Sequence, residues 1–205
     1  MTQIRKIPVL VTVAMLLVSA GGVASAQSFD AQALPGLSPG SRDAVAKDAA
    51  DAPAGLYTLA ISPTGRWEAS AAKNRSTEER IANVLQRCEH REQAPCILAV
   101  VDGRATGETS PRASGLTYPD AFELAAVPFI REGVRSAIDD KFMRRPDHRA
   151  LAINRHGTWG SSYNRSSADD AAKGAIENCA KNGRDCFLYA IDDKVVFTRE
   201  TVIRP

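Results

Sequence analysis

The sequence predicts an α+β fold built from two diverged copies of one cysteine-bearing unit. One observation is an ordered series of matches between two stretches of the chain, in which Leu59-Ala60-Ile61 recurs as Leu151-Ala152-Ile153. Another is that each stretch carries two cysteines at matching positions. A third is that strand-like and helix-like hydrophobic patterns alternate in both. Each repeat is therefore expected to hold a helix, a β-hairpin, a disulfide-linked helix and a strand, and the pattern leaves open whether the repeats share one antiparallel sheet.

The later matches follow the same order in both stretches. They pair Gly65 and Trp67 with Gly157 and Trp159, Asn74 to Ser76 with Asn164 to Ser166, Cys88 with Cys179, Cys96 with Cys186, and Asp102 with Asp192. An ordered series over about seventy residues indicates an internal repeat. We therefore place the first repeat, with a weakly ordered N-terminal segment, at 27–108, and the second, with its leading helices, at 109–205.

Residues 1–26 form a predicted signal peptide. Arg5 and Lys6 supply its positive charge, an apolar run covers 7–18, and small residues lead to Ala26. A membrane anchor would need about 20 predominantly apolar residues, which is more than this run provides. We expect cleavage after Ala26 and a periplasmic or secreted protein with no membrane span after cleavage.

The formal charge argues against nucleic acid as a partner. The chain has 26 Lys and Arg and 24 Asp and Glu, and two of the basic residues lie in the predicted signal peptide. The mature chain is therefore formally neutral. Nucleic-acid phosphates are bound by clustered Lys and Arg, whereas the densest basic patch, around Arg144 and Arg145, is interspersed with aspartates.

Each repeat contains a predicted hairpin followed by a helix. Strands at 58–62 and 66–71 flank a turn at Gly65, and strands at 149–154 and 158–163 flank Gly157. Ser76 then precedes Glu79 as in a capping box, and Ser167 precedes Asp170 in the same way. Spacing at i, i+3, i+4 and i+7 predicts the buried face of each helix. These faces are Ile81, Val84, Leu85 and Cys88 in the first repeat and Ala172, Ala175, Ile176 and Cys179 in the second.

The other elements are predicted from shorter signals. Apolar runs at 96–101 and 186–191 suggest strands, and 195–198 suggests a last hairpin arm. A helix is expected over 128–142, with Pro128 in its first turn. Its counterpart at 35–52 lacks large apolar residues, so we expect it to be less well anchored.

The four cysteines are predicted to form two local disulfides. In an oxidising compartment an even count at matching positions favours Cys88 with Cys96 and Cys179 with Cys186. Closing such short loops contributes on the order of 2.5 kcal/mol each, less any strain. The alternative for the first pair is a zinc site that adds His90, but the second repeat has no matching histidine and zinc prefers four ligands. No metal or other cofactor is therefore expected.

No catalytic residues are assigned from the sequence. A Gly-x-Ser-x-Gly motif is absent, the adjacent aspartates point in different directions, and no glycine pattern suits a phosphate loop. Whether the protein is an enzyme stays open.

The aromatic residues are the candidates for binding. Trp67 and Trp159 each follow a turn glycine by two residues, and Tyr163 lies further along the same strand as Trp159. One interpretation is that the tryptophans pack in the core. The other is that they form stacking platforms for a glycan or a peptide, with His156 in the neighbouring turn.

The second repeat resembles a family of exported bacterial domains known only as a domain of unknown function. The resemblance lies in Ala152-Ile153, Gly157, Trp159-Gly160, Ser162-Tyr163-Asn164, Ser167, Ala171-Ala172, Ala175, and Cys179 through Cys186. The first repeat resembles it more faintly, because Glu68 replaces the second glycine. The resemblance implies a small cysteine-containing α+β module of the cell envelope or of secreted proteins, and implies no reaction.

The sequence therefore favours an exported, non-catalytic binding or protein-interaction protein of the bacterial cell envelope. Its partner would be an envelope protein or a cell-wall glycan. The alternative is an envelope hydrolase or an enzyme inhibitor with a site between the repeats, near His148, Arg155 and His156.

Overall fold

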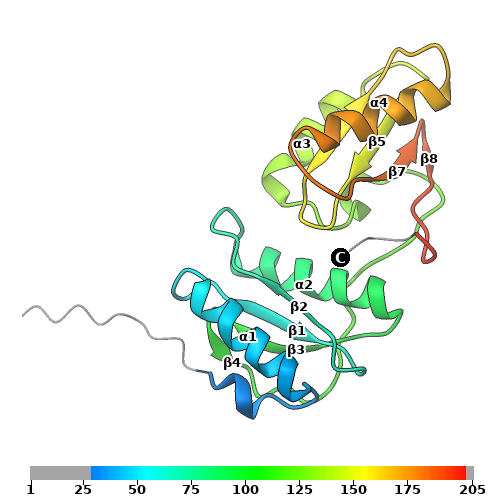
Figure 1. Cartoon of the computed structure of the whole chain (residues 1–205). Coiled ribbons are helices and arrows are strands. Elements are labelled where there is room, and N and C mark those ends of the chain that lie inside the picture. Colours follow the sequence, from blue (N-terminus) through cyan, green and yellow to red (C-terminus); the bar gives the residue numbers. More distant parts are fainter. Residues whose placement is uncertain (1–28, 202–205) are drawn as a thin grey trace, which may run out of the picture.

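The computed structural model describes residues 29–201, which form two halves that each contain a four-stranded antiparallel sheet (Figure 1). We call residues 29–112 the first half and residues 113–201 the second half. The predicted signal peptide lies outside the described residues. The α+β class is confirmed, and the two halves have separate sheets instead of sharing one.

The first half has strand order β2-β1-β3-β4. The hairpin and the helix after it lie where the sequence predicted them, to within one or two residues. The elements are η1 (Ala31–Ala33), α1 (Pro39–Asp51), β1 (Thr58–Ile61), β2 (Trp67–Ser70), α2 (Thr77–Glu92), β3 (Ile97–Val101) and β4 (Arg104–Ala105).

The second half repeats this order as β6-β5-β7-β8. It differs in the segment before its first strand, where short helical pieces replace a single helix. The elements are η2 (Leu124–Ala126), η3 (Glu132–Val134), α3 (Arg135–Ile138), η4 (Asp139–Met143), β5 (Ala150–Ile153), β6 (Trp159–Ser162), α4 (Ala168–Ala180), β7 (Phe187–Ile191) and β8 (Lys194–Val195).

A shared irregularity supports the correspondence of the halves. The pairing of β1 with β3 shifts register between Leu59 and Ala60, and the pairing of β5 with β7 shifts between Leu151 and Ala152. These residues occupy matching positions in the sequence. Because a bulge adds a residue at one place in a ladder, its recurrence at the same place shows that the two sheets share detailed geometry.

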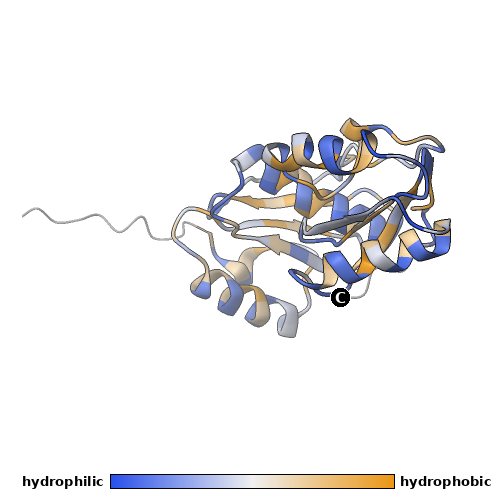
Figure 2. Ribbon diagram, turned by 90° about the horizontal axis from the view of Figure 1, so that it is seen from above, coloured by the Kyte–Doolittle hydropathy of each residue, from blue (hydrophilic) through white to orange (hydrophobic). Residues whose placement is uncertain are grey.

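Each sheet is covered on both faces. In the first half, Leu59, Ile61 and Val100 pack with Val45 of α1, while Ala60 and Leu98 pack with α2. The second half buries a larger aromatic cluster on the face opposite α4. Hydrophobic residues are concentrated along the strands, and the helices carry hydrophilic residues on their outer sides (Figure 2).

Both predicted disulfides are confirmed. Cys88 at the end of α2 bonds to Cys96, and Cys179 at the end of α4 bonds to Cys186. Each disulfide joins the C-terminal part of a helix to the residue directly before the next strand. The capping box at Ser76 is also confirmed, since its hydroxyl accepts from the Glu79 N–H and the Glu79 carboxylate accepts from the Ser76 N–H.

The continuous helix expected over 128–142 is wrong in its first part. Phe129 has a left-handed backbone (φ 64°), and helical structure begins only at Glu132. The backbone of Phe129 is bonded to the first half: its N–H donates to Oε1 of Gln86 and its carbonyl accepts from Arg75. These contacts replace the hydrogen bonds that a helix would form here.

The predicted buried face of the second-half helix is also partly wrong, because Ile176 is 38% exposed. The face that packs on the sheet is formed by Ala171, Gly174, Ala175 and Cys179. These small side chains let α4 approach β6 closely. A Cβ added at Gly160 would lie 2.2 Å from the backbone nitrogen of Cys179, so only glycine fits there.

Between residues 29 and 201, every helix is too short or too polar to cross a bilayer.

Candidate functional site

The two halves meet along a stripe of buried polar side chains on α2. Arg80, Asn83, Arg87 and His90 are all almost fully buried, and they recur at i, i+3, i+7 and i+10. This spacing places them on one side of the helix. The opposite side carries Val84, Leu85 and Cys88 to the sheet. α2 therefore has an apolar face toward its own half and a polar face that mostly turns toward the other half.

Contacts across this junction are made largely by side chains that donate to backbone carbonyls. Arg75 Nη2 donates to the carbonyls of Phe129 at 2.7 Å and His156 at 3.2 Å. Asn83 Nδ2 donates to the carbonyl of Arg155 at 3.2 Å. Buried carbonyls need such donors because water does not reach them. The β5–β6 turn of the second half is thereby fixed against the first half.

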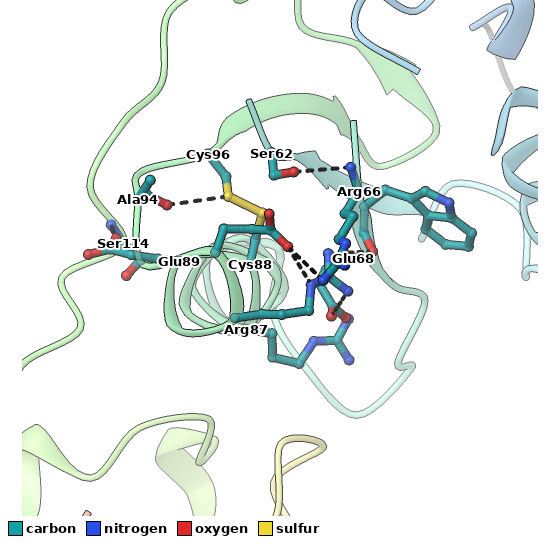
Figure 3. The surroundings of a disulfide bond; sticks show 12 residues. Ser62, Arg66, Glu68, Arg87, Cys88, Glu89, Ala94, Cys96 and Ser114 are labelled. Atoms are coloured by element: carbon teal, nitrogen blue, oxygen red, sulfur yellow. Dashed lines mark hydrogen bonds and ion pairs between the residues drawn. A yellow bond between two sulfur atoms is a disulfide. The ribbon is translucent and has the colours of Figure 1, made fainter. Parts of the chain in front are cut away.

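Glu68 places a buried carboxylate at the centre of this junction. It extends from β2 toward α2, where its oxygens lie 3.1 Å from Arg87 Nη2 and 2.7 Å from Arg91 Nη1 (Figure 3). Arg155, from the second half, approaches the same carboxylate at 3.4 Å. The side chains of Glu68 and Arg87 are each only 4% exposed. One carboxylate thus links three guanidinium groups from both halves.

The second half has no equivalent of this cluster. Gly160 stands where the first half has Glu68, and Asn178 stands where it has Arg87. Asn178 Nδ2 donates to the carbonyl of Ser161 instead. Glu68, which replaces the glycine of the second repeat, is therefore the residue that organises the contact between the halves.

His156 lies in the β5–β6 turn between two arginines. Arg87 Nη1 is 3.1 Å from its Nδ1, and Arg155 Nε is 3.3 Å from its Nε2. Partial burial of the ring, followed by repulsion from Arg87 and Arg155, lowers the pKa of His156 to about 4. The imidazole is therefore neutral at pH 7, although the residue as a whole remains accessible to solvent.

His90 is also held neutral, at the other end of the stripe. Its Nε2 lies 2.7 Å from the carbonyl of Thr201, and its Nδ1 lies 2.8 Å from the hydroxyl of Tyr118. The carbonyl can only accept, so Nε2 carries the proton and Nδ1 accepts from the tyrosine. Burial lowers the pKa of His90, which favours this neutral form.

A polar recess of about 330 Å³ opens beside the β5–β6 turn, between the two halves. We call it the Trp159 recess. Its aromatic wall is Trp159, which is half-buried and also packs against the core of the second half. The other lining residues are Ala72, Asn74, Arg75, Arg131, Val134, His156, Gly157, Thr158 and Asn182.

Only two of the four predicted binding residues come together. Trp159 and His156 both line the recess. Trp67 packs against the core of the first half, and its carbonyl accepts from Arg91. Tyr163 is 40% exposed and lies under the guanidinium of Arg145, at 4.8 Å from the ring centroid. Trp67 and Trp159 therefore lie in different surroundings, although they occupy matching positions in the sequence.

The alternative grouping of His148, Arg155 and His156 is only partly formed. Arg155 and His156 lie together in the turn that follows β5. His148 precedes β5 and thus lies at the opposite end of that strand, where it is exposed. In the alternative that the sequence disfavours, Cys88 and Cys96 would bind zinc, but they are joined in a disulfide, so their sulfurs are not available as thiolates.

Several residues of the junction were missed by sequence reasoning, namely Glu68, Arg75, Arg87 and Arg91. Of these four residues, Arg87 has a signal in the sequence. The face of α2 opposite the predicted apolar one carries polar residues with helical spacing, and long polar side chains in such a stripe normally face solvent. The burial of this stripe becomes evident only in the structure, where the second half covers it.

The fold and the recess define an α+β protein of two disulfide-containing halves with a polar, tryptophan-lined site at their junction. The chain matches no protein-family model, no curated protein and no solved structure.

Proposed function

We propose that this is an exported, non-catalytic binding protein of the bacterial cell envelope, and that it binds a cell-wall glycan in the Trp159 recess. The observation that carries the proposal is the convergence of one indole with amide and guanidinium donors in a single concave site. Sites for small ligands combine an aromatic surface with a few oriented polar groups.

The chemistry of the recess suits a sugar. The apolar face of a sugar ring packs on an indole, while its hydroxyl groups pair with side-chain amides and guanidinium groups. Asn74, Asn182 and Arg131 supply such groups around Trp159. Arg75 is less adaptable, because it is already bonded to two carbonyls.

The protonation state of His156 favours binding over hydrolysis. A general acid or base works best when its pKa is near the operating pH. With a pKa of about 4, His156 holds almost no proton to donate at pH 7 and is a weak base. It serves better as a fixed wall of the recess than as a catalyst.

The two disulfides support export, because such bonds persist in oxidising compartments. Together with the signal peptide predicted at 1–26, they agree with a periplasmic or secreted protein. Membership in the exported family of unknown function that the second repeat resembles is part of the same proposal.

Retention on purified cell wall tests the proposal. The chain from Gln27 should be retained, and Trp159→Ala should weaken retention about tenfold, as expected for loss of an aromatic contact. Because Trp159 also packs in the core, Arg131→Ala provides a second variant that leaves the core intact. Tyr163→Ala, an exposed aromatic outside the recess, is the matched control. Equal retention of all four proteins would contradict the proposal.

A further inference from the structure

A second cavity, of about 300 Å³, lies next to the Trp159 recess. We call it the arginine cavity. Arg155 lines it, whereas the next two residues of the same turn line the recess. Its walls come from the end of α2, the β5–β6 turn and the segment after β8. The residues are Arg87, His90, Arg91, Gln93, Arg155, Arg199, Glu200 and Thr201.

Positive charge exceeds negative charge in this cavity. Arg87, Arg91 and Arg155 share the carboxylate of Glu68, and Arg91 also pairs with Glu92. Glu200 adds a third carboxylate in the lining itself, so the four lining arginines still outnumber the carboxylates around them. Arg199 forms no ion pair with any residue between 29 and 201 and lies over the ring of Tyr118.

The pKa of Arg87, the most buried of these arginines, reflects its burial and the positive charges around it. Desolvation lowers the pKa of Arg87 to about 10, with repulsion from Arg155, Arg75 and Arg91 opposing the attraction of Glu68. Arg87 is still protonated at pH 7. Its Nε is buried and has no hydrogen-bond partner within the described part of the chain.

The cavity wall is fixed in place. Gln93 ends α2 with a left-handed backbone, and its side-chain amide donates to the carbonyls of His90 and Arg199. The contact of His90 with Thr201 holds the same segment. These bonds hold the backbone that carries Arg199, and Glu68 holds the guanidinium groups of Arg87, Arg91 and Arg155. Preorganised donors lose less entropy on binding.

We propose that the arginine cavity binds a small ligand through its carboxylate or phosphate groups. Guanidinium groups present paired N–H donors that match both kinds of oxyanion. The four lining arginines carry more positive charge than Glu68, Glu92 and Glu200 together balance. The volume limits the ligand to a small molecule or to one terminal group of a larger one. This site is independent of glycan binding in the Trp159 recess.

Calorimetric titration of the chain from Gln27 at low ionic strength tests the assignment, with citrate and inorganic phosphate as probes. At least one probe should bind with a stoichiometry of one. Arg199→Gln should weaken that binding about tenfold, the loss expected for one charge-assisted hydrogen bond. Arg104→Gln is the matched control, because Arg104 is likewise exposed and forms no ion pair in residues 29–201.

Two results would overturn the assignment. One is absence of heat with both probes at millimolar concentration. The other is equal weakening by Arg199→Gln and Arg104→Gln, which would show that net charge alone attracts the anion. Trp159→Ala separates this inference from the proposed function: it should leave anion binding unchanged, and loss of anion binding in that variant would place the anion in the recess instead.

Discussion

At the scale of single residues, Glu68 connects the two halves through one buried carboxylate. Burying a carboxylate is unfavourable unless cations and hydrogen bonds compensate for lost water. Here three arginines from both halves surround it. The sequence pattern does not predict that Glu68 is buried, because a glutamate on a short strand next to a polar turn is normally a surface residue.

We predict that Glu68→Gln destabilises the protein by about 3 kcal/mol or more, because it leaves several buried or half-buried guanidinium groups without their shared counterion. Urea denaturation measures the change. Glu108→Gln removes a carboxylate from the exposed pair with Arg112 and should change stability by less than about 1 kcal/mol. Similar small effects for both variants would show that Glu68 does not hold the junction together.

The cysteines, unlike Glu68, have partners that the sequence predicts. Their pairing could be predicted from the sequence, because the repeat restricts which partners are equivalent and because the loops between them are short. Likewise, the Ser76 cap depends only on residues within one helical turn. Features determined by neighbours in sequence were predictable, whereas the burial of Glu68 depends on side chains from α2 and from the β5–β6 turn of the other half.

At the scale of elements, α2 and α4 occupy the same place in their halves but pack differently. α2 presents large residues to its sheet, whereas α4 presents Ala171, Gly174 and Ala175 and lies closer. The i, i+3, i+4, i+7 spacing of Ala172, Ala175, Ile176 and Cys179 predicted that Ile176 is buried, whereas the face that packs on the sheet is centred on the smaller residues. The glycine at position 160 decided the outcome, because it lets the helix approach the strand.

Gly160→Ala should therefore destabilise the protein by about 1–3 kcal/mol, since the added methyl group would displace α4 from β6. Gly40→Ala, in α1, is the matched control. A Cβ at Gly40 meets no atom within 4 Å, so this change should stabilise by up to about 1 kcal/mol. Thermal or urea unfolding of both variants provides the comparison, and a neutral Gly160→Ala would refute the close-approach argument.

The segment over 128–142 illustrates why helix prediction failed. Its apolar spacing fits a helix, yet the backbone of Phe129 bonds to Gln86 and Arg75 of the first half. Contacts of this kind bring together residues more than forty positions apart in sequence. Local pattern contains no information about them.

At the scale of the whole molecule, the junction between the halves is polar and its two histidines are neutral. Unfolding would expose His90 and His156 to water and return their pKa values toward 6.5. Below pH 6.5, these two histidines therefore bind more protons in the unfolded chain than in the folded protein. Stability contributed by these groups is therefore present at pH 7 and is lost as the pH falls from 6.5 toward 4.

We predict that His156→Gln makes the free energy of unfolding less dependent on pH between 6.5 and 5, a range above the pKa of most carboxylates. Denaturation at a series of pH values measures the slope. His148→Gln, at the other end of β5, is the control and should retain the wild-type slope. An unchanged slope in His156→Gln would mean that His156 titrates normally in the folded protein.

The central claim is that the junction of the halves forms a binding site around Trp159. The most direct measurement is a titration of the ¹⁵N-labelled chain with soluble cell-wall glycan fragments, followed by NMR. The chain has two tryptophans, so its two indole N–H signals report on both candidate positions at once. We predict that the indole of Trp159 and the side-chain amides of Asn74 and Asn182 shift together, while the indole of Trp67 does not. A shift of the Trp67 indole alone, or no shift of either indole at millimolar glycan, would contradict this account.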